Sequence, residues 1–438
     1  MNKSKQLEFQ FETDLFKKIC EIDNLRKAFK AVKRNKGAPG IDGITIEKYE
    51  TNLEENLNQL RKEVQSWTFK PTPVRRVEIP KPGGKGVRLL GVPIIKDRVL
   101  HMAIKIILEP IFDPEFSKSS FGFRPGKNQQ QAVQQAQKIV QSGKEYVVDI
   151  DLSKFFDRIN HDRLIHRIKQ RIKDTRVLKL IGMILRGDIM IDGIKTPSKE
   201  GSVQGSPLSP LLSNIVLDEL DKELEQRGLE FCRFADDCNI FAKSQRAADK
   251  IMDSMKKFIE KKLKLKVNEE KSKTRKSNEV KFLGMTIEQG TIAIAKATYN
   301  KAMDKVKTLI PRGSHLPFDK AIEEVNKWYR GWASYFKMTQ YPAQLKAIEA
   351  HIRRRFRARF VNQQKKKRNL WNLLMKRGIP RSCAGKIIYS NRGPWSLSHT
   401  RALEKTYSIE WFMKRGQTII SNLQMDHWYG IEKWVKLA

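Results

Sequence analysis

Paired cysteines, long apolar segments and acidic residues are all scarce in this sequence, and each shortage excludes a class of protein. The four cysteines, Cys20, Cys232, Cys238 and Cys383, include no CxxC pair. Neither a disulfide framework nor a zinc ribbon is therefore indicated, and we expect reduced, mostly buried thiols. The sequence contains no run of about 20 apolar residues, which is the length needed to span a bilayer, and its first residues lack an apolar signal core. We expect no membrane partner and a cytoplasmic location.

Acidic residues are outnumbered to an unusual degree. Asp and Glu number 49 against 86 Lys and Arg, which gives a formal net charge of +37 over 438 residues. Solubility alone requires far less, so the predicted partner is a polyanion. Hydrophobic residues at 39% and eight Trp indicate folded cores rather than a disordered basic tail. The length exceeds the ~250–300 residues at which single cores stop growing, so we predict two or three domains.

Helices and short strands alternate in the first two thirds of the chain. Helical spacing over residues 12–36 and 45–66 flanks a turn-rich loop at 36–43, and a β-hairpin is predicted from 74–79 and 87–90 around a Gly-rich tip. The later predictions are helices over 97–108, 128–141, 207–226 and 245–262, strands over 146–150 and 280–285, and a hairpin over 231–241. These elements predict an α+β sheet with helices on one face.

Strand patterns stop near residue 295, where we place a domain boundary. Beyond it, Ile322, Val325, Trp328, Tyr329 and Trp332 recur at the spacing of an amphipathic helix. Residues 301–438 contain 29 Lys and Arg against 9 Asp and Glu. In 353–360 and 365–368 the cations interleave with or follow aromatic residues, which suits phosphate binding with stacking; the alternative is a solvated helix face.

Two adjacent carboxylates, Asp236 and Asp237, stand between apolar flanks in the hairpin predicted over 231–241. Turns favour Asp, so an exposed turn is one interpretation. The other is a Mg²⁺ site, because Mg²⁺ takes one or two carboxylates together with substrate phosphates.

A second acidic segment favours the metal site. Asp149 and Asp151 alternate with Val148 and Ile150 at a strand end, so both carboxylates share one face. Carboxylates from two strands can bind two metal ions, one for a primer hydroxyl and one for triphosphate oxygens. This arrangement is that of a polymerase.

The motifs resemble those of one family. Phe-Ala-Asp-Asp at 234–237 resembles the Tyr-Ala-Asp-Asp box of reverse transcriptases, and residues 151–161 and 201–214 resemble two further boxes of the group II intron reverse transcriptases. Matches at 79–91, 122–126 and 281–284 extend the likeness. The resemblance implies a right-hand polymerase with fingers, palm and thumb and a helical basic C-terminal thumb or maturase region.

That resemblance implies four segments and a set of site residues. The segments are an N-terminal extension with the start of the fingers (1–72), the fingers and palm (73–294), a helical thumb (295–370) and a basic RNA- or DNA-binding segment (371–438). Asp151, Asp236 and Asp237 are implied as catalytic metal ligands, with the Leu152 carbonyl as a fourth. Nucleotide-binding residues would be Lys81, Arg88, Phe156, Gln204 and Lys271, and primer or template contacts Phe234, Phe282, Gly284 and Arg124.

Blander interpretations stay open for several of these residues. Phe156 is implied as the steric gate against the ribonucleotide 2′-hydroxyl, but it could be a core phenylalanine. Lys81, Arg88 and Lys271 could be solvated cations. Gln204 could belong to an ordinary loop, and Phe282 and Gly284 to a short core strand. Phe234 replaces the family's usual tyrosine, which removes a hydroxyl but keeps the ring.

The implied function is RNA-directed DNA synthesis with two Mg²⁺ ions, for which Mn²⁺ could substitute, in intron mobility and assisted splicing. The partners would be an RNA template, a DNA or RNA primer, dNTPs, structured intron RNA and a DNA target. The last 68 residues hold only Cys383, His399 and His427 of the usual zinc ligands, which resembles the endonuclease-lacking bacterial branch. Two alternatives remain: a domesticated reverse transcriptase in defence or DNA repair, and a non-enzymatic splicing cofactor.

Overall fold

A computed structural model of the chain describes residues 14–80, 87–191, 194–196, 200–202 and 205–421. The chain divides into two compact units between Lys276 and Ser277. This division falls before the boundary that we predicted near residue 295. Each unit has a hydrophobic core of its own.

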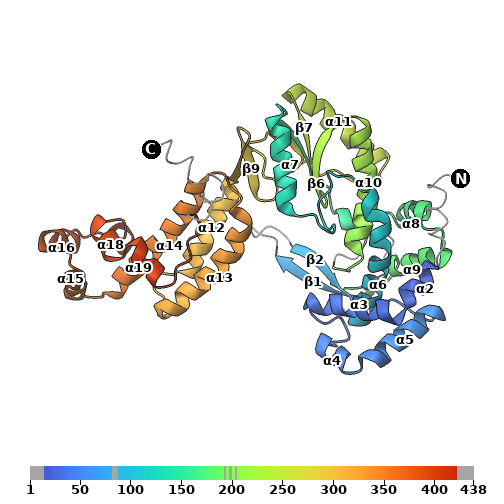
Figure 1. Cartoon of the computed structure of the whole chain (residues 1–438), viewed down its shortest axis with the longest axis horizontal. Helices are drawn as coiled ribbons and strands as arrows, with labels where there is room; N and C mark the ends of the chain where they lie inside the picture. The colour runs from blue at the N-terminus through green and yellow to red at the C-terminus, as the bar shows by residue number, and fades with distance from the viewer. Residues whose placement is uncertain (1–13, 81–86, 192–193, 197–199, 203–204, 422–438) are drawn as a thin grey trace. The chain divides into compact units, whose positions relative to one another are not determined.

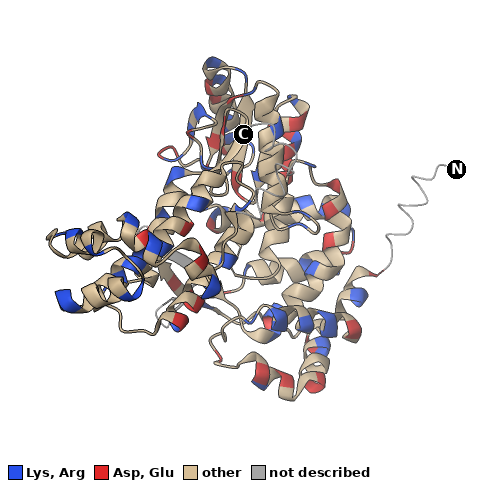
Figure 2. Cartoon of the chain, turned by 60° about the vertical axis from the view of Figure 1, so that its left-hand side comes forward, with Lys and Arg blue, Asp and Glu red and all other residues tan. Residues whose placement is uncertain are grey.

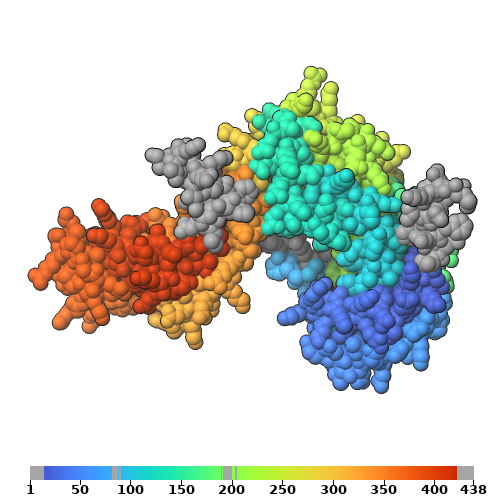
Figure 3. All heavy atoms as spheres, viewed as in Figure 1, coloured from blue at the N-terminus to red at the C-terminus, as the bar shows by residue number. Residues whose placement is uncertain are grey.

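The first unit opens with helices α2 (Leu15–Cys20), α3 (Ile22–Arg34), α4 (Ile46–Thr51) and α5 (Leu53–Gln65), which form a continuous surface (Figure 3). The two helical regions that we predicted are each broken once, at Glu21 and at Asn52, where the backbone leaves helical geometry. The turn-rich loop between them packs on α6 (Ile95–Phe112): Arg98 donates to the Ala38 carbonyl at 2.8 Å. A Cβ added at Gly40 would lie 2.7 Å from Ile94, so the loop requires glycine there.

The predicted β-hairpin is confirmed as β1 (Val74–Pro80) and β2 (Val87–Val92), paired antiparallel with Val77 opposite Leu90. Two strands that we did not predict, β4 (Ile189–Ile191) and β5 (Ile194–Thr196), complete a sheet of order β2-β1-β4-β5. β4 pairs parallel with β1. Strands of three residues carry too little periodicity to be recognised in a sequence.

A second sheet holds the acidic motifs, in the order β6-β7-β3-β8. Its strands β6 and β7 are labelled in Figure 1. Its strands are β3 (Tyr146–Ile150), β6 (Glu230–Phe234), β7 (Asp237–Ala242) and β8 (Lys273–Lys276). The central strand β3 is antiparallel to both β7 and β8. Val148, Ile150 and Ile240 are 0–1% exposed and pack with α11 residues such as Met255, so alternation turns Asp149 to the opposite face.

The helices around this sheet complete the first unit. The predicted helices are confirmed, with shifted ends, as α6, α7 (Gln129–Gln141), α10 (Ser209–Gln226) and α11 (Gln245–Lys261). The others are α8 (His161–Arg171), α9 (Thr175–Leu185) and the 3-10 turns η1 (Asp113–Glu115) and η2 (Phe155–Arg158). Cys20, Cys232 and Cys238 are buried in this unit, as expected, whereas Cys383 of the second unit is exposed.

The second unit has a small hairpin near its start, β9 (Met285–Glu288) and β10 (Thr291–Ile294), and the regular elements described after it, up to residue 421, are helices. Its helices are α12 (Lys296–Leu309), α13 (Phe318–Phe336), α14 (Pro342–Gln363), α15 (Lys367–Lys376), α16 (Arg381–Ile388), α17 (Pro394–Leu397), α18 (Arg401–Thr406) and α19 (Ile409–Lys414). Tyr329 and Phe356, both 0% exposed, lie at the centre of its core. In the part of the chain that the structure describes, no helix is long and apolar enough to cross a membrane.

Our prediction of a strand over 280–285 was wrong. Phe282 and Met285 exchange two backbone hydrogen bonds of 2.9 Å around Leu283 and Gly284, whose φ angles are 51° and 85°. Two consecutive left-handed residues make a tight turn, which the apolar Val280, Phe282 and Leu283 disguise as a strand.

Candidate active site

Asp236 and Asp237 lie at the tip of the hairpin formed by β6 and β7. Phe234 pairs with Asp237, so Ala235 and Asp236 are the two central residues of the turn. Ala235 is left-handed, with φ at 59°, which a residue with a Cβ rarely adopts. Strain of this kind gathers at functional sites and persists only where the surroundings enforce it.

Asp151 follows directly after β3 and lies at the level of this tip. The pairing of the two strands ends with Ile150 opposite Cys238, so the next step of the antiparallel register sets Asp151 beside Asp237. The backbone of Asp151 is fixed on its other side: its carbonyl accepts from Asn268 N at 2.8 Å, and its amide donates to Ser272 Oγ at 3.0 Å. The sheet therefore gathers the three carboxylate-bearing positions that we predicted from separate motifs.

Lys271 extends toward these carboxylates. Its Nζ is 3.3 Å from Asp151 Oδ2, with the two side chains 63% and 38% exposed. An exposed pair of this kind contributes little to stability, so it is free to exchange for another partner. Lys271 was predicted as a nucleotide-binding residue, and this contact places its ammonium beside Asp151.

The donors at this site are oxygens, which are the ligands that Mg²⁺ prefers. Among the described residues, no three His, Cys, Asp or Glu side chains converge as a preformed metal cage. A cage is not required, because Mg²⁺ usually keeps water and substrate phosphates among its ligands. The donor chemistry at Asp151, Asp236 and Asp237 therefore fits divalent metal ions that bind together with substrate.

Asp149 shares the face of Asp151 but lies two residue pairs further into the sheet, opposite Asn239. Burial raises the pKa of Asp149 to about 6, and the charge of Asp151 acts in the same direction, against Arg275. Asp149 is therefore an inner neighbour of the site, and it was not among the ligands that we predicted.

Phe156 lies in the 3-10 turn η2 after Asp151, and it is half-buried, whereas its neighbour Phe155 is 3% exposed and belongs to the core. The two rings meet edge to face at 5.3 Å. The Phe156 carbonyl accepts from Ser202 N at 2.7 Å, which ties its backbone to the loop that leads to residue 204. Phe156 thus follows Asp151 closely in the chain and also packs against the core of the first unit.

The loop with the Gln-Gly-Ser-Pro motif runs against the β1–β2 hairpin. Gly205 has φ at 123°, and a Cβ there would lie 2.2 Å from the Gly91 carbonyl oxygen. Ser206 Oγ is 2.9 Å from Nδ1 of the buried His101, whose pKa burial lowers to about 4. Gln204 and Lys81 lie outside the described residues; the backbone of Arg88 belongs to β2, opposite Ile79.

Arg124, which we predicted as a primer or template contact, binds groups of its own loop. Its Nε donates to Asp113 Oδ1 at 2.7 Å, and its other nitrogens donate to the carbonyls of Ser117, Ser120 and Asp113 at 2.6–2.9 Å. The side chain is 7% exposed. Most of its donors are thus engaged in holding the loop 113–124.

Phe123 is the site residue that the sequence reasoning missed. It is 48% exposed, and its ring lies 6.4 Å from that of Phe234. Its φ of 59° turns it out of the loop that Arg124 holds. The two rings form an apolar surface beside the carboxylates; the Gly-Phe-Arg-Pro motif was the available signal.

Phe282 flanks the tight turn near the start of the second unit, and Gly284 is one of the two central residues of this turn. The Tyr335 hydroxyl donates to the Leu283 carbonyl at 2.9 Å, and a Cβ at Gly284 would lie 3.1 Å from the Phe336 ring. Phe282 is 5% exposed. The turn is thus fixed on α13, and its proposed contact with a primer belongs to its backbone and Gly284.

The arginines of α14 correct our expectation for residues 353–360. Arg353, Arg357 and Arg359 are 2–8% exposed. Arg357 donates twice to the Tyr407 carbonyl, at 3.0 and 2.7 Å, and burial lowers its pKa to about 10. Arg355 donates to the Ile310 carbonyl at 2.6 Å. These side chains hold helices together, and Arg354 is half-buried.

Among the basic residues that Figure 2 colours blue, those at and around α15 and α16 include a run of exposed cations. The run Lys365-Lys366-Lys367-Arg368 is exposed throughout. Tyr389, directly after α16, is 76% exposed, with Lys367 Nζ 5.6 Å from its ring. Cations around an open aromatic ring suit a nucleic-acid strand with an unstacked base.

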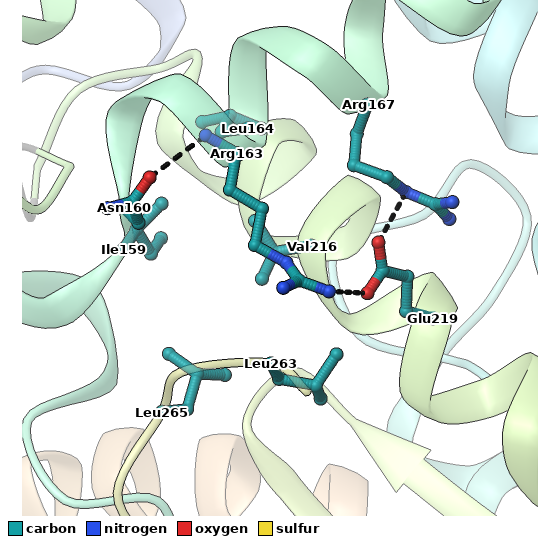
Figure 4. Close-up of a pocket in the computed structure, with 9 residues that line it drawn as sticks. All are labelled: Ile159, Asn160, Arg163, Leu164, Arg167, Val216, Glu219, Leu263 and Leu265. Atoms are coloured by element: carbon teal, nitrogen blue, oxygen red, sulfur yellow. Dashed lines mark hydrogen bonds and ion pairs between the residues drawn. The ribbon is translucent and has the colours of Figure 1, made fainter. Parts of the chain in front are cut away.

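A hollow between α8 and α10 carries no ligand site (Figure 4). Arg163 and Arg167 both bind Glu219 there, the latter at 3.1 Å. The cavity of about 10 Å³ has room for about one water molecule.

Comparison with known proteins agrees with the two sets of motifs. Residues 79–287 match the family model for reverse transcriptase (RNA-dependent DNA polymerase), and residues 299–378 match that for the group II intron, maturase-specific domain. The chain is therefore a reverse transcriptase-type α+β fold followed by a maturase-specific domain. It belongs to the family of group II intron reverse transcriptases and maturases.

Three relatives illustrate the likeness. Protein YkfC of Escherichia coli is 30% identical over 299 residues, which cover 59% of this chain and 78% of that protein. The group II intron-encoded protein LtrA of Lactococcus lactis subsp. cremoris is 28% identical, covering 71% of this chain but 63% of its own length. A Cas6-RT-Cas1–Cas2 complex chain is 28% identical over 57% of this chain and 43% of its own, with a TM-score of 0.38.

Proposed function

We propose that the chain is an RNA-directed DNA polymerase that acts in group II intron mobility and assists intron splicing. The observation that carries the polymerase is the register of β3 and β7, which sets Asp151 beside Asp237 at the strained turn that bears Asp236. The family models support both parts of the proposal, since one covers each set of motifs.

The three aspartates would hold two divalent ions, Mg²⁺ or Mn²⁺, which neutralise charge on a primer 3′-hydroxyl and on the triphosphate of a dNTP. The Leu152 carbonyl is the proposed fourth ligand. Because its backbone is tied to residues 267–272, the Asp151 segment is preorganised for this task.

The residues around the aspartates would orient the substrates. The half-buried Phe156 would contact the sugar of the dNTP and exclude a 2′-hydroxyl. Phe123 and Phe234 would pack against the last primer base pair, and Lys271 would leave Asp151 for the phosphates. Lys81, Arg88 and Gln204 are proposed for the same nucleotide.

The proposal is tested by primer extension on an RNA template with Mg²⁺ and dNTPs, with and without a chelator. Wild-type protein is expected to make DNA only with the metal, and Asp236→Ala to make none while binding RNA as the wild type does. RNA binding without synthesis by the wild type would instead favour a splicing cofactor without polymerase activity.

The splicing role rests on the exposed cations of α15 and α16, which suit a folded RNA. It is tested separately, by adding the protein to its intron RNA at low Mg²⁺ and measuring the splicing rate. Asp236→Ala should accelerate splicing as well as the wild type does, because the two activities would use different residues.

A further inference from the structure

A buried ion pair lies directly behind the acidic turn. Arg233 and Asp221 are both 0% exposed, and Arg233 Nε and Nη2 donate to the two Asp221 oxygens at 2.6 and 2.5 Å. Arg233 is the last residue but one of β6, and Asp221 lies on α10. The pair therefore links the strand that enters the turn to the helix behind it.

The same guanidinium also holds the turn itself. Its Nη1 donates to the carbonyl of Ala235 at 2.9 Å and to Asn214 Oδ1 at 3.0 Å. Asn214, also 0% exposed, in turn donates from Nδ2 to the Gly122 carbonyl at 2.9 Å.

Gly122 closes the arrangement from the other side of Ala235. A Cβ at Gly122 would lie 2.2 Å from the Ala235 nitrogen and 2.9 Å from the Phe234 carbonyl carbon, so the two backbones touch. Ala235 is thus held at its carbonyl by Arg233 and at its amide side by Gly122, and Asn214 joins the two supports.

Stability alone does not explain this design. A buried ion pair often contributes no more to folding than apolar residues of the same volume would, because both charges must be desolvated. The pair and Asn214 provide directional hydrogen bonds to the carbonyls of Ala235 and Gly122. These bonds hold Ala235 in a left-handed conformation that alanine rarely adopts.

We infer that Asn214, Arg233 and Asp221 are positioning residues that impose the left-handed turn at Ala235 and so aim the side chains of Asp236 and Asp237. Three motifs meet in this one network: Gly122 from Gly-Phe-Arg-Pro, Asn214 from the end of the Gln-Gly-Ser-Pro box, and Arg233 from the segment with the paired aspartates. For its effect on catalysis, this inference rests on the proposed polymerase function.

The test compares Asn214→Ala with Asn24→Ala in the full chain. Asn24 is a matched control: it is a 6% exposed asparagine on α3, and its Nδ2 donates to the carbonyls of Ile19 and Ala103, each at 3.2 Å. Both variants lose a buried amide, but Asn24 has no link to the acidic turn.

Two readouts are measured for each variant. Hydrogen exchange of the peptide 230–242 is expected to accelerate about tenfold in Asn214→Ala and to stay at the wild-type rate in Asn24→Ala. In primer extension, Asn214→Ala is expected to lower kcat roughly 10- to 100-fold and to raise the half-saturating Mg²⁺ concentration, while template–primer affinity is unchanged.

The outcomes separate this inference from the proposed function. Unchanged exchange over 230–242 in Asn214→Ala, or equal losses of kcat in both variants, would overturn the positioning role. If the wild type makes no DNA, the polymerase proposal fails, and the exchange comparison by itself decides whether the network imposes the turn.

Discussion

Buried and half-buried arginines stabilise both units, but the balance of their partners differs. In the first unit, Arg233 and Arg124 bind the carboxylates of Asp221 and Asp113. In the second, Arg357 meets the Glu404 carboxylate at 3.3 Å, but Arg355 and Arg357 donate mainly to the carbonyls of Ile310 and Tyr407. These two residues are the C-caps of α12 and α18, where the last helical carbonyls lack partners and carry partial negative charge.

The difference follows from composition. No Asp or Glu occurs between Glu349 and Glu404, so a cation buried in α14 has few carboxylates to meet and uses helix ends instead. The comparison teaches that a run of arginines in a basic segment does not by itself identify a nucleic-acid surface. Exposure divides the basic residues of the second unit into those that hold the fold and those that are open to a partner.

The largest expected effect concerns stability, and it tests the division between buried and exposed arginines of the second unit. Arg357→Ala should lower the free energy of unfolding by about 2–4 kcal/mol, because it leaves the Tyr407 carbonyl without its donor and removes a packed side chain. The exposed Arg368→Ala is the matched control and should change it by less than about 0.5 kcal/mol. Urea unfolding followed by circular dichroism measures both, and equal effects would contradict the division.

A buried acid in the first unit gives the next largest effect. Asp97 is 2% exposed and accepts from Thr72 N at 2.8 Å, and burial raises its pKa from 3.8 to about 7. The folded state therefore holds this proton more tightly than the unfolded chain does. Its contribution to stability is fully present below pH 3.8 and is lost as the pH rises through about 7.

Asp97→Asn should remove this dependence. Between pH 4 and pH 8, the wild type should lose about 1–3 kcal/mol of unfolding free energy relative to the variant, since each pKa unit corresponds to about 1.4 kcal/mol. Denaturant unfolding at a series of pH values measures the difference, and parallel curves would show that Asp97 is not protonated in the fold.

The smallest expected effect concerns the exposed basic residues of the second unit and their binding of RNA. Replacing Lys365, Lys366 and Lys367 by alanine should weaken RNA binding about tenfold at moderate salt and reduce the slope of log affinity against log salt by about 0.7–0.9 for each phosphate that is no longer neutralised. Unfolding free energy should not change. Filter binding over a salt series measures the slope, and an unchanged slope would place the RNA elsewhere.

Regular patterns made much of the first unit predictable. The strands were predicted from the alternation around Asp149 and Asp151 and from the apolar flanks of Asp236. The strand over 146–150 in turn predicted that Asp149 and Asp151 share one face. The pairing of β3 with β7 could not be read in the same way, because register depends on contacts between residues 88 to 96 positions apart in the sequence. Our prediction of the three carboxylates together rested on the family resemblance.

Other features depended on the direction in which a side chain points, which the spacing of residue types does not show. Arg124 turns inward to Asp113 because its loop brings four oxygen atoms to it, which no local spacing indicates. In α14, apolar residues and arginines alternate without one clear apolar face, so the sequence could not show which arginines are buried. The turn at Leu283 and Gly284 was hidden for the converse reason, since its flanks are as apolar as a strand.

The central claim is that the end of β3 belongs to the reacting site, and one pair of variants tests it directly. Asp151→Asn and Asp149→Asn change the same chemical group on the same face, two residues apart in the sequence. In primer extension on an RNA template, Asp151→Asn should lower kcat by at least about 10³-fold, while Asp149→Asn should stay within about tenfold of the wild type. Synthesis near the wild-type rate by Asp151→Asn would contradict the account.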